Sequence, residues 1–233
     1  TDAMNNLFSD FLDVFVIVFL DDILIFSKNE EDHHIHVSKV LERLNNNKWY
    51  ANWDKSMFFR TSVEYCGVQV AAGTIQVLKD KVDAVLDWPV PKTVRDVRAF
   101  LGLAGYYRRF IHKFSALARP LTNLTRKDIP FVVDNNVLSA FDSIKTALCT
   151  SPVLYLPNQA LPFVVVPDAS GYAVGGVLLQ DHNDGTGFHP ISFVSRQMTD
   201  AELKYTTHQQ ELMAVFHCFK QWRHLLLGRT VTV

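Results

Sequence analysis

Two adjacent aspartates, Asp21 and Asp22, stand between two strongly apolar stretches of the chain, Val14–Leu20 and Ile23–Phe26. Carboxylates held between apolar strands repel each other and lose hydration, which costs free energy unless a cation pairs with them. Carboxylate oxygens are ligands for hard cations such as Mg²⁺, and two-metal phosphoryl-transfer sites depend on them. The pair therefore indicates metal-dependent phosphoryl transfer. The alternative is a solvent-exposed Asp-Asp turn without a catalytic role, which the apolar flanks disfavour.

A second segment whose residues could bind a ligand is Tyr106–Phe114, in which aromatic and basic side chains are interleaved. Aromatic residues at helical spacing usually pack in a core, so we expect one face of this segment to be buried. The basic side chains Arg108, Arg109 and Lys113 would then meet the phosphates of a nucleic acid.

Histidines and cysteines give a weaker metal signal. His33, His34 and His36 lie together without nearby cysteines, which favours a solvated helix start over a zinc site. The three cysteines of the chain are far apart and form no CxxC pair. This pattern argues against a disulfide framework and is typical of a reducing intracellular compartment.

The apolar patterns near the acidic pair predict the elements that hold it. The two flanks predict a buried β-hairpin with the acids at its tip, preceded by the end of a helix over Met4–Leu12. Helical spacing over Asp32–Leu44 predicts a helix that covers one face of this sheet. Val63–Val70 and Ile75–Val77 predict a second hairpin that turns at Gly73.

The middle of the chain has the pattern of packed helices. Lys79–Trp88 places its valines on one helical face, and Pro89 and Pro91 end that helix. Thr93, with Asp96 three residues later, predicts a capping box at the start of the next helix.

The last third of the chain has the pattern of an α/β domain. Phe163–Val166, Ala173–Leu179 and Phe188–Val194 predict three strands, and Ala201–Leu227 predicts one long helix. The segment Thr230–Val233 has the composition of a further strand.

Composition limits the functional classes. The chain has 233 residues and 48% hydrophobic residues, enough for two or three small globular domains. Its 23 basic and 24 acidic residues give a net charge of -1, so any nucleic-acid contact must rest on local patches. The apolar run that ends at Asp21 is much shorter than the ~20 residues of a membrane-spanning helix. Because the chain begins with Thr1, we expect it to be part of a longer protein.

Three motifs resemble the reverse transcriptase–RNase H region of gypsy-class long-terminal-repeat retrotransposons. Phe19–Ser27 (FLDDILIFS) resembles the catalytic hairpin, Tyr65–Val68 (YCGV) the primer-grip hairpin, and Arg98–Ile111 (RAFLGLAGYYRRFI) the thumb signature. The motifs follow the family's order and spacing over essentially the whole chain. FLDD alone would be weak evidence.

For the first half of the chain, the resemblance implies a polymerase. Asp21 and Asp22 would be catalytic residues and metal ligands. The residues implied in nucleic-acid binding are Tyr65, Cys66, Gly67, Arg108, Arg109 and Lys113. The implied cofactor is Mg²⁺, with Mn²⁺ as a substitute.

For the last third, the resemblance implies a retroviral-type RNase H. Asp168, at the end of an apolar strand, and Glu211, on the long helix, match its first two carboxylates. Both would be catalytic residues and metal ligands, because carboxylates from a strand and a helix can converge on metal ions that activate water. As isolated residues, both would more often be surface acids.

Several positions depart from the family pattern without removing a catalytic carboxylate. Phe19 replaces a tyrosine, Val68 a histidine, Val133 a tryptophan and Pro167 a threonine. The further carboxylates of both family sites have no match in this sequence, and we expect them before and after it. We therefore expect this chain by itself to polymerise and cleave poorly or not at all.

The resemblance implies an α+β, mixed α/β fold in four parts. These are a partial palm (1–78), a helical thumb (79–130), a connecting segment (131–160) and a partial RNase H-like domain (161–233). The expected partners are an RNA template, a DNA primer and an RNA–DNA hybrid, with dNTP in the complete enzyme, a homodimer partner, and no membrane. The expected location is intracellular, in a cytoplasmic virus-like particle or the nucleus. The alternative is a non-catalytic or domesticated fragment that acts as a nucleic-acid-binding or protein-interaction scaffold.

Overall fold

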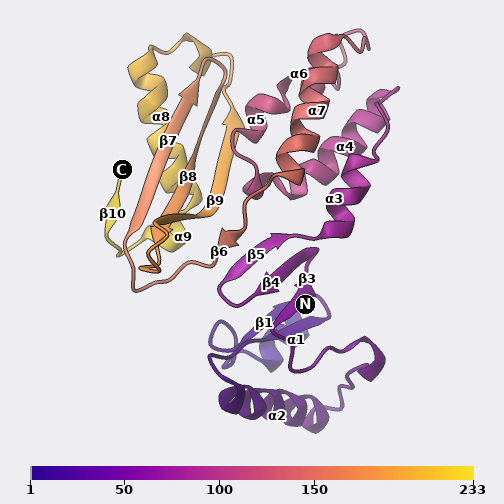
Figure 1. Ribbon diagram of the computed structural model, residues 1–233, viewed down its shortest axis with the longest axis vertical. Helices are drawn as coiled ribbons and strands as arrows, with labels where there is room; N and C mark the ends of the chain where they lie inside the picture. The colour runs from indigo at the N-terminus through magenta and orange to yellow at the C-terminus, as the bar shows by residue number, and fades with distance from the viewer. Residues whose placement is uncertain (1) are drawn as a thin grey trace. The chain divides into compact units, whose positions relative to one another are not determined.

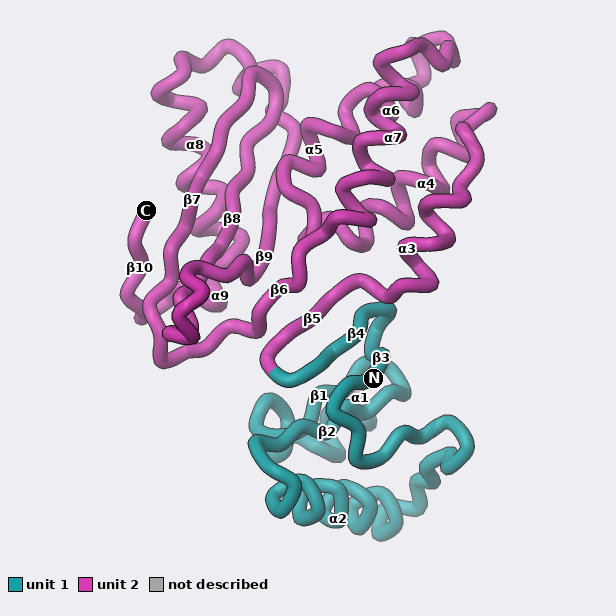
Figure 2. The backbone as a smooth tube through the Cα atoms, in the orientation of Figure 1, with its two compact units in different colours: residues 1–72 teal, residues 73–233 magenta. Residues whose placement is uncertain are grey.

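The computed structural model describes residues 2–233, in which two compact units are distinguished, residues 1–72 and 73–233 (Figure 2). Helices and strands occur in both units (Figure 1), which confirms the predicted mixed α/β fold class. Across residues 2–233, no helix combines the length and the apolar character that a membrane crossing requires.

The first unit is built on a two-stranded antiparallel sheet with a long helix against it. Its elements are α1 (Asp2–Leu7), β1 (Val16–Phe19), β2 (Asp22–Ile25), α2 (Glu30–Asn46), η1 (Trp53–Lys55), β3 (Ser62–Tyr65) and β4 (Val68–Ala71). Its core contains the rings of Phe8 and Phe15 together with apolar side chains of α2. The helix predicted over Asp32–Leu44 is confirmed, and the side chain of Asn29 caps its start.

Two predictions for the first unit are wrong in their bounds. The helix predicted over Met4–Leu12 ends at Leu7, and turns follow it. The strand predicted over Val63–Val70 is two antiparallel strands, β3 and β4, joined at Cys66 and Gly67. Both turn residues have positive φ, 48° and 70°, as a type I′ hairpin turn requires. The apolar residues on both sides of this turn conceal it in the sequence.

After the short strand β5 (Thr74–Val77), the second unit continues with a helical part. Its elements are α3 (Lys79–Leu86), α4 (Val94–Tyr106), η2 (Arg108–Phe110), α5 (Phe114–Leu117), α6 (Arg119–Asn123) and α7 (Asn135–Cys149). The predicted capping box is confirmed, because Asp96 N donates to Thr93 Oγ1 at 3.2 Å and Thr93 N donates to Asp96 Oδ2 at 2.9 Å. Helix α7 falls in the segment 131–160, for which only a connection was predicted. It packs on α4, with the Phe100 and Phe141 ring centroids 4.5 Å apart.

A four-stranded sheet with the order β10-β7-β8-β9 follows (Figure 1). Its strands are β7 (Phe163–Ser170), β8 (Ala173–Asp181), β9 (Phe188–Gln197) and β10 (Val231–Thr232). The first three are antiparallel neighbours, whereas β10 runs parallel to β7. All four predicted strands are thus confirmed, and β9 is an edge strand. Two short strands, β5 (Thr74–Val77) and β6 (Leu154–Tyr155), pair with each other.

The long helix predicted over 201–227 is instead three pieces. These are η3 (Glu202–Lys204), α8 (Thr207–Gln221) and α9 (Arg223–Leu226). Helix α8 has its own capping box, formed by Thr206 and Gln209, and this starts a new helix. In η3, which precedes α8, the Glu202 carboxylate binds the guanidinium of Arg196 in β9 through two contacts of 2.7 Å. These contacts fix η3 to β9.

Helix α8 lies on one face of the sheet against β7 and β8 (Figure 1). Two glycines of β8 allow this close approach. Cys218 Sγ on α8 donates to Gly175 O at 3.4 Å, and a Cβ atom at Gly176 would lie 2.6 Å from that sulfur. The glycines therefore determine how closely α8, the helix that carries Glu211, approaches the sheet.

Candidate catalytic carboxylates and nucleic-acid interface

Asp21 and Asp22 lie at the tip of the β1–β2 hairpin, as predicted. Phe19 pairs with Asp22, so Leu20 and Asp21 form a two-residue turn in which Leu20 has a φ of 54°. The predicted burial is wrong, because both acids are exposed and the Phe19 side chain is 54% exposed. Only one face of this small sheet is covered by core residues. The two carboxylates therefore keep their hydration, and their solvent-facing oxygens are accessible to a ligand.

The β3–β4 hairpin lies beside this acidic hairpin in the same unit. The Tyr65 hydroxyl donates to the backbone carbonyl of Ile17 in β1 at 3.4 Å. Burial raises the pKa of Tyr65 to about 12, with further contributions from Cys66 and from the negative charge of Asp22. The structure thus brings the Tyr65 side chain to the acidic hairpin, near enough to Asp22 for that carboxylate to affect its pKa.

Asp168 lies near the end of β7, paired with Gly175 of β8. Phe163 and Val165 on the same strand are buried in the core that contains Cys218 of α8. Successive side chains of a strand point to opposite faces, so Asp168 lies on the face away from α8. There it lines a small cavity together with His112.

Glu211 occupies the second turn of α8 and is exposed. It precedes the buried residues Ala214 and Cys218 by three and seven positions, which puts it on the helical face turned to the sheet. The structure therefore brings β7 and α8 together. By strand alternation, however, it leaves Asp168 on the opposite face of the sheet from Glu211.

Asp168 has a cationic partner from the helical part of the unit. Lys113 Nζ lies 3.1 Å from Asp168 Oδ1, in a pair whose side chains are 45% and 36% exposed. Lys113 has a left-handed backbone with a φ of 54°, at the start of α5. The neighbouring His112 has a lowered pKa because of burial and the Lys113 charge, which Asp168 opposes.

The other predicted basic residues contact their own unit as well. Arg108 donates to the backbone carbonyl of Ser195 and, at 3.4 Å, to Ser115 Oγ. The Arg109 guanidinium lies 5.2 Å from the centroid of the Phe110 ring. The predicted packing face is confirmed by buried Tyr107 and Phe110.

The contacts that join the helical part to the sheet were not predicted. Ser115 N donates to Ser195 Oγ at 2.9 Å, across 80 residues of chain. The Arg108–Ser195 and Lys113–Asp168 contacts span 87 and 55 residues. No local pattern signals such contacts, because each partner alone reads as an ordinary surface residue.

The carboxylates fit a divalent cation in kind but not in number. Asp21, Asp22, Asp168 and Glu211 offer the hard oxygen donors that Mg²⁺ and Mn²⁺ prefer. Within the described part of the chain, however, no three His, Cys, Asp or Glu residues gather closely enough to hold a metal ion. Asp21 with Asp22, Asp168 and Glu211 are therefore each at most part of a metal site.

Two family models match the chain. Residues 1–70 match "Reverse transcriptase (RNA-dependent DNA polymerase)", and residues 134–233 match "RNase H-like domain found in reverse transcriptase". The first match contains the Asp21–Asp22 turn, and the second contains Asp168 and Glu211.

Curated relatives align along almost the whole chain. A retrovirus-related Pol polyprotein from transposon 297 of Drosophila melanogaster is 35% identical over 228 residues, 97% of this chain. The transposon Tf2-3 polyprotein of Schizosaccharomyces pombe is 34% identical over 223 residues, 96% of this chain. The chain carries the reverse transcriptase and RNase H-like domains of a retrotransposon Pol polyprotein. It spans 21% and 17% of the lengths of these two relatives.

Solved structures agree with the fold of this Pol chain. A foamy viral protease-reverse transcriptase in complex with an RNA/DNA hybrid matches 99% of the Pol chain, with a TM-score of 0.83 and 22% identity, over 31% of that protein's own chain. The foamy viral protease-reverse transcriptase dRH in complex with double-stranded DNA gives a TM-score of 0.85 at the same identity, over 40% of its chain.

Proposed function

We propose that the Pol chain takes part in RNA-directed DNA synthesis and in RNA cleavage from RNA–DNA hybrids, within a gypsy-class element. The observation that carries the polymerase half is the contact between Tyr65 and the β1 strand of the acidic hairpin. This contact ties the hairpin that carries the YCGV turn to the acidic hairpin, and it supports one surface that offers both carboxylates and a hairpin for a primer strand.

In this proposal the turn geometry keeps the reactive oxygens in place. The paired strands on either side restrict Asp21 and Asp22, and exposure leaves their oxygens accessible. A bound divalent ion, Mg²⁺ or Mn²⁺, would supply charge stabilisation for phosphoryl transfer between a DNA primer and a dNTP on an RNA template. The exposed ring of Phe19 would contact the nucleic acid next to the carboxylates.

The RNase H half rests on Asp168 and Glu211, which sit on elements in contact with each other. For both to reach one metal ion, the Asp168 side chain must leave Lys113 and turn toward the α8 side. Arg108, Arg109 and Lys113 would then contact the phosphates of the hybrid. The solved neighbours with bound RNA/DNA hybrid or double-stranded DNA support nucleic acid as the partner.

A non-catalytic nucleic-acid-binding scaffold is the second candidate. The Lys113–Asp168 pair favours it, because an ammonium group already neutralises one of the two RNase H-like carboxylates. Because no three potential metal ligands gather within the described residues, we expect weak or no turnover from this chain by itself.

Substitutions in the full-length polyprotein separate these candidates. Asp21→Asn should abolish primer extension while hybrid cleavage continues, and Glu211→Gln should do the reverse, because each carboxylate serves one site. Lys127→Gln, which alters an exposed residue outside both pairs, is the control. Both activities retained in both variants would refute the assignment. Hybrid binding without either activity in the unmodified polyprotein would favour the scaffold.

A further inference from the structure

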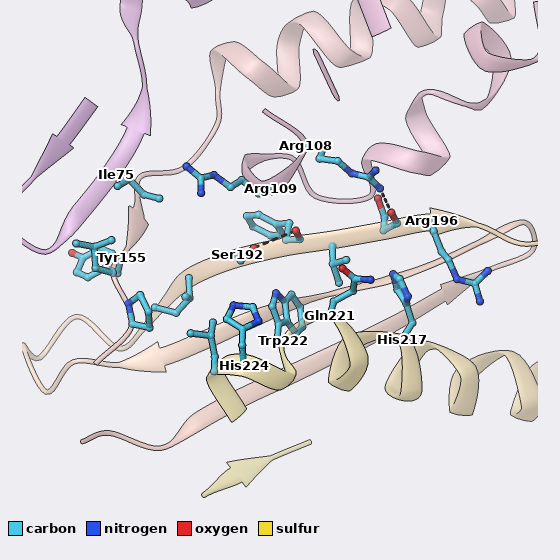
Figure 3. Close-up of a pocket in the computed structure, with 17 residues that line it drawn as sticks. Ile75, Arg108, Arg109, Tyr155, Ser192, Arg196, His217, Gln221, Trp222 and His224 are labelled. Atoms are coloured by element: carbon cyan, nitrogen blue, oxygen red, sulfur yellow. Dashed lines mark hydrogen bonds between the residues drawn. The ribbon is translucent and has the colours of Figure 1, made fainter. Parts of the chain in front are cut away.

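A cavity of about 650 Å³ lies in the second unit, lined by residues of η2, β9, α8 and α9 (Figure 3). Ligand pockets in proteins commonly measure about 300–1,000 Å³, so this space suits a molecule of nucleotide size rather than a lone ion. None of the four predicted catalytic carboxylates lines it.

The lining of this cavity is cationic. Arg108, Arg109 and Arg196 contribute guanidinium groups, and His217 and His224 contribute imidazoles. No aspartate or glutamate occurs among the described residues that line it. Because Arg196 is already paired with a glutamate outside the lining, the positive potential comes mainly from Arg108 and Arg109.

His217 is a buried polar group without a partner. Its side chain is 8% exposed, and its Nε2 atom has no hydrogen-bond partner among the residues that the structure describes. Burial lowers the pKa of His217, and the charges of Arg196 and Arg108 lower it further. The Nε2 atom of His217 is therefore buried without a hydrogen-bond partner, an arrangement that costs free energy unless a ligand completes it.

Two further donors border the same space. Gln221 follows His217 by one helical turn, on the same side of α8, and its side chain is exposed. Arg109 comes from η2, which belongs to the helical part of the unit (Figure 3). A guanidinium has five N–H donors in a planar fork that suits a phosphate.

We propose that this cavity binds the phosphate group of a nucleotide, with His217, Gln221 and Arg109 as donors. A phosphate supplies negative charge to the cationic lining and an acceptor oxygen to the Nε2–H tautomer of His217. The phosphate fills only part of the space. Tyr155 and Phe193 also line the cavity and provide rings for a nucleobase. The nucleotide is either free or the phosphorylated end of a strand, since both present the same group.

Binding of AMP to this chain tests the proposal, with adenosine as the ligand that lacks only the phosphate. AMP should shift the Nε2 resonance of His217 in NMR spectra of the histidine side chains, and adenosine should bind at least about tenfold more weakly. Gln221→Glu should weaken AMP binding by at least about tenfold, because it places a like charge beside the phosphate. Asn136→Asp, an equally charged change at an exposed position of α7, should leave it unaltered.

Gln221 and Arg109 are exposed, so Gln221→Glu and Arg109→Gln are expected to fold, and thermal unfolding verifies this. Equal affinity for AMP and adenosine, an unmoved His217 resonance, or unchanged AMP binding by folded Gln221→Glu would each overturn the proposal. Competition identifies the source of the phosphate. Displacement of AMP by a 5′-phosphorylated oligonucleotide, but not by its 5′-hydroxyl form, indicates strand ends. AMP binding without such displacement indicates free nucleotide.

Discussion

Gly176 offers a direct test of how α8 is held against the sheet. In Gly176→Ala, the added Cβ would lie 2.6 Å from Cys218 Sγ and 2.7 Å from the carbonyl oxygen of Val166. Both distances are well below ordinary van der Waals contact, and one of the two atoms belongs to the backbone of the neighbouring strand. Either the strand or the helix must move to accommodate the methyl group.

The expected loss of folding free energy follows from overpacking of a buried contact. Extra methyl groups in a well-packed core typically destabilise by about 1–3 kcal/mol. For a protein of this size, that loss corresponds to a decrease in Tm of roughly 2–12 °C. Adding Cys218→Ala removes the sulfur but leaves the Val166 carbonyl in place, so only part of the loss should be recovered.

Gly102→Ala is the matched control, because a Cβ at this exposed position of α4 meets nothing within 4 Å. It should stabilise the protein by about 0.5–1 kcal/mol, since alanine is the better helix former. Thermal unfolding followed by circular dichroism compares the two variants. Equal Tm values for Gly176→Ala and Gly102→Ala would refute the account of close helix–sheet packing.

Three further predictions concern charged and titrating groups. The pKa of Glu202 is lowered to about 2, chiefly by its hydrogen bonds with Arg196. The ionised Glu202 carboxylate therefore stabilises the folded protein fully above pH 4.5, the ordinary pKa of glutamate, and this stabilisation is lost as the pH falls toward 2. Glu202→Gln should therefore lower Tm at neutral pH and reduce the loss of Tm over that acid range, and an unchanged acid profile would contradict this. Burial, as the largest cause, raises the pKa of Tyr65 to about 12, so Tyr65→Phe should reduce the tyrosine absorbance change near that pH; an absorbance titration that is the same in Tyr65→Phe and in the unmodified chain would count against the geometry. If Arg109 meets a phosphate of bound RNA–DNA hybrid, Arg109→Gln should lower the slope of log affinity against log salt concentration by about one, whereas an unaltered slope would remove Arg109 from the interface.

Local sequence patterns were sufficient to predict the elements that hold the carboxylates. The hairpin around Asp21 and Asp22, the capping box of Thr93 and the strands of the sheet depend on neighbours within a few residues, so their signals are present in the sequence. Helix ends and turns were less accurate. The turn at Cys66 and Gly67 lies between apolar residues that conceal it, whereas the start of α8 at Thr206 was signalled by Thr206 and Gln209, which the single predicted helix passed over.

The sequence by itself determined the class of protein, the kinds of ligand atoms and most of the elements, because these depend on residue type and short spacing. Only the tertiary structure decided the exposure of the acidic turn, the pairing of Asp168 with Lys113 and the unpartnered state of His217. Each of these depends on which surfaces meet across tens of residues of chain. The packing of a whole unit determines these contacts, and no short sequence pattern predicts them.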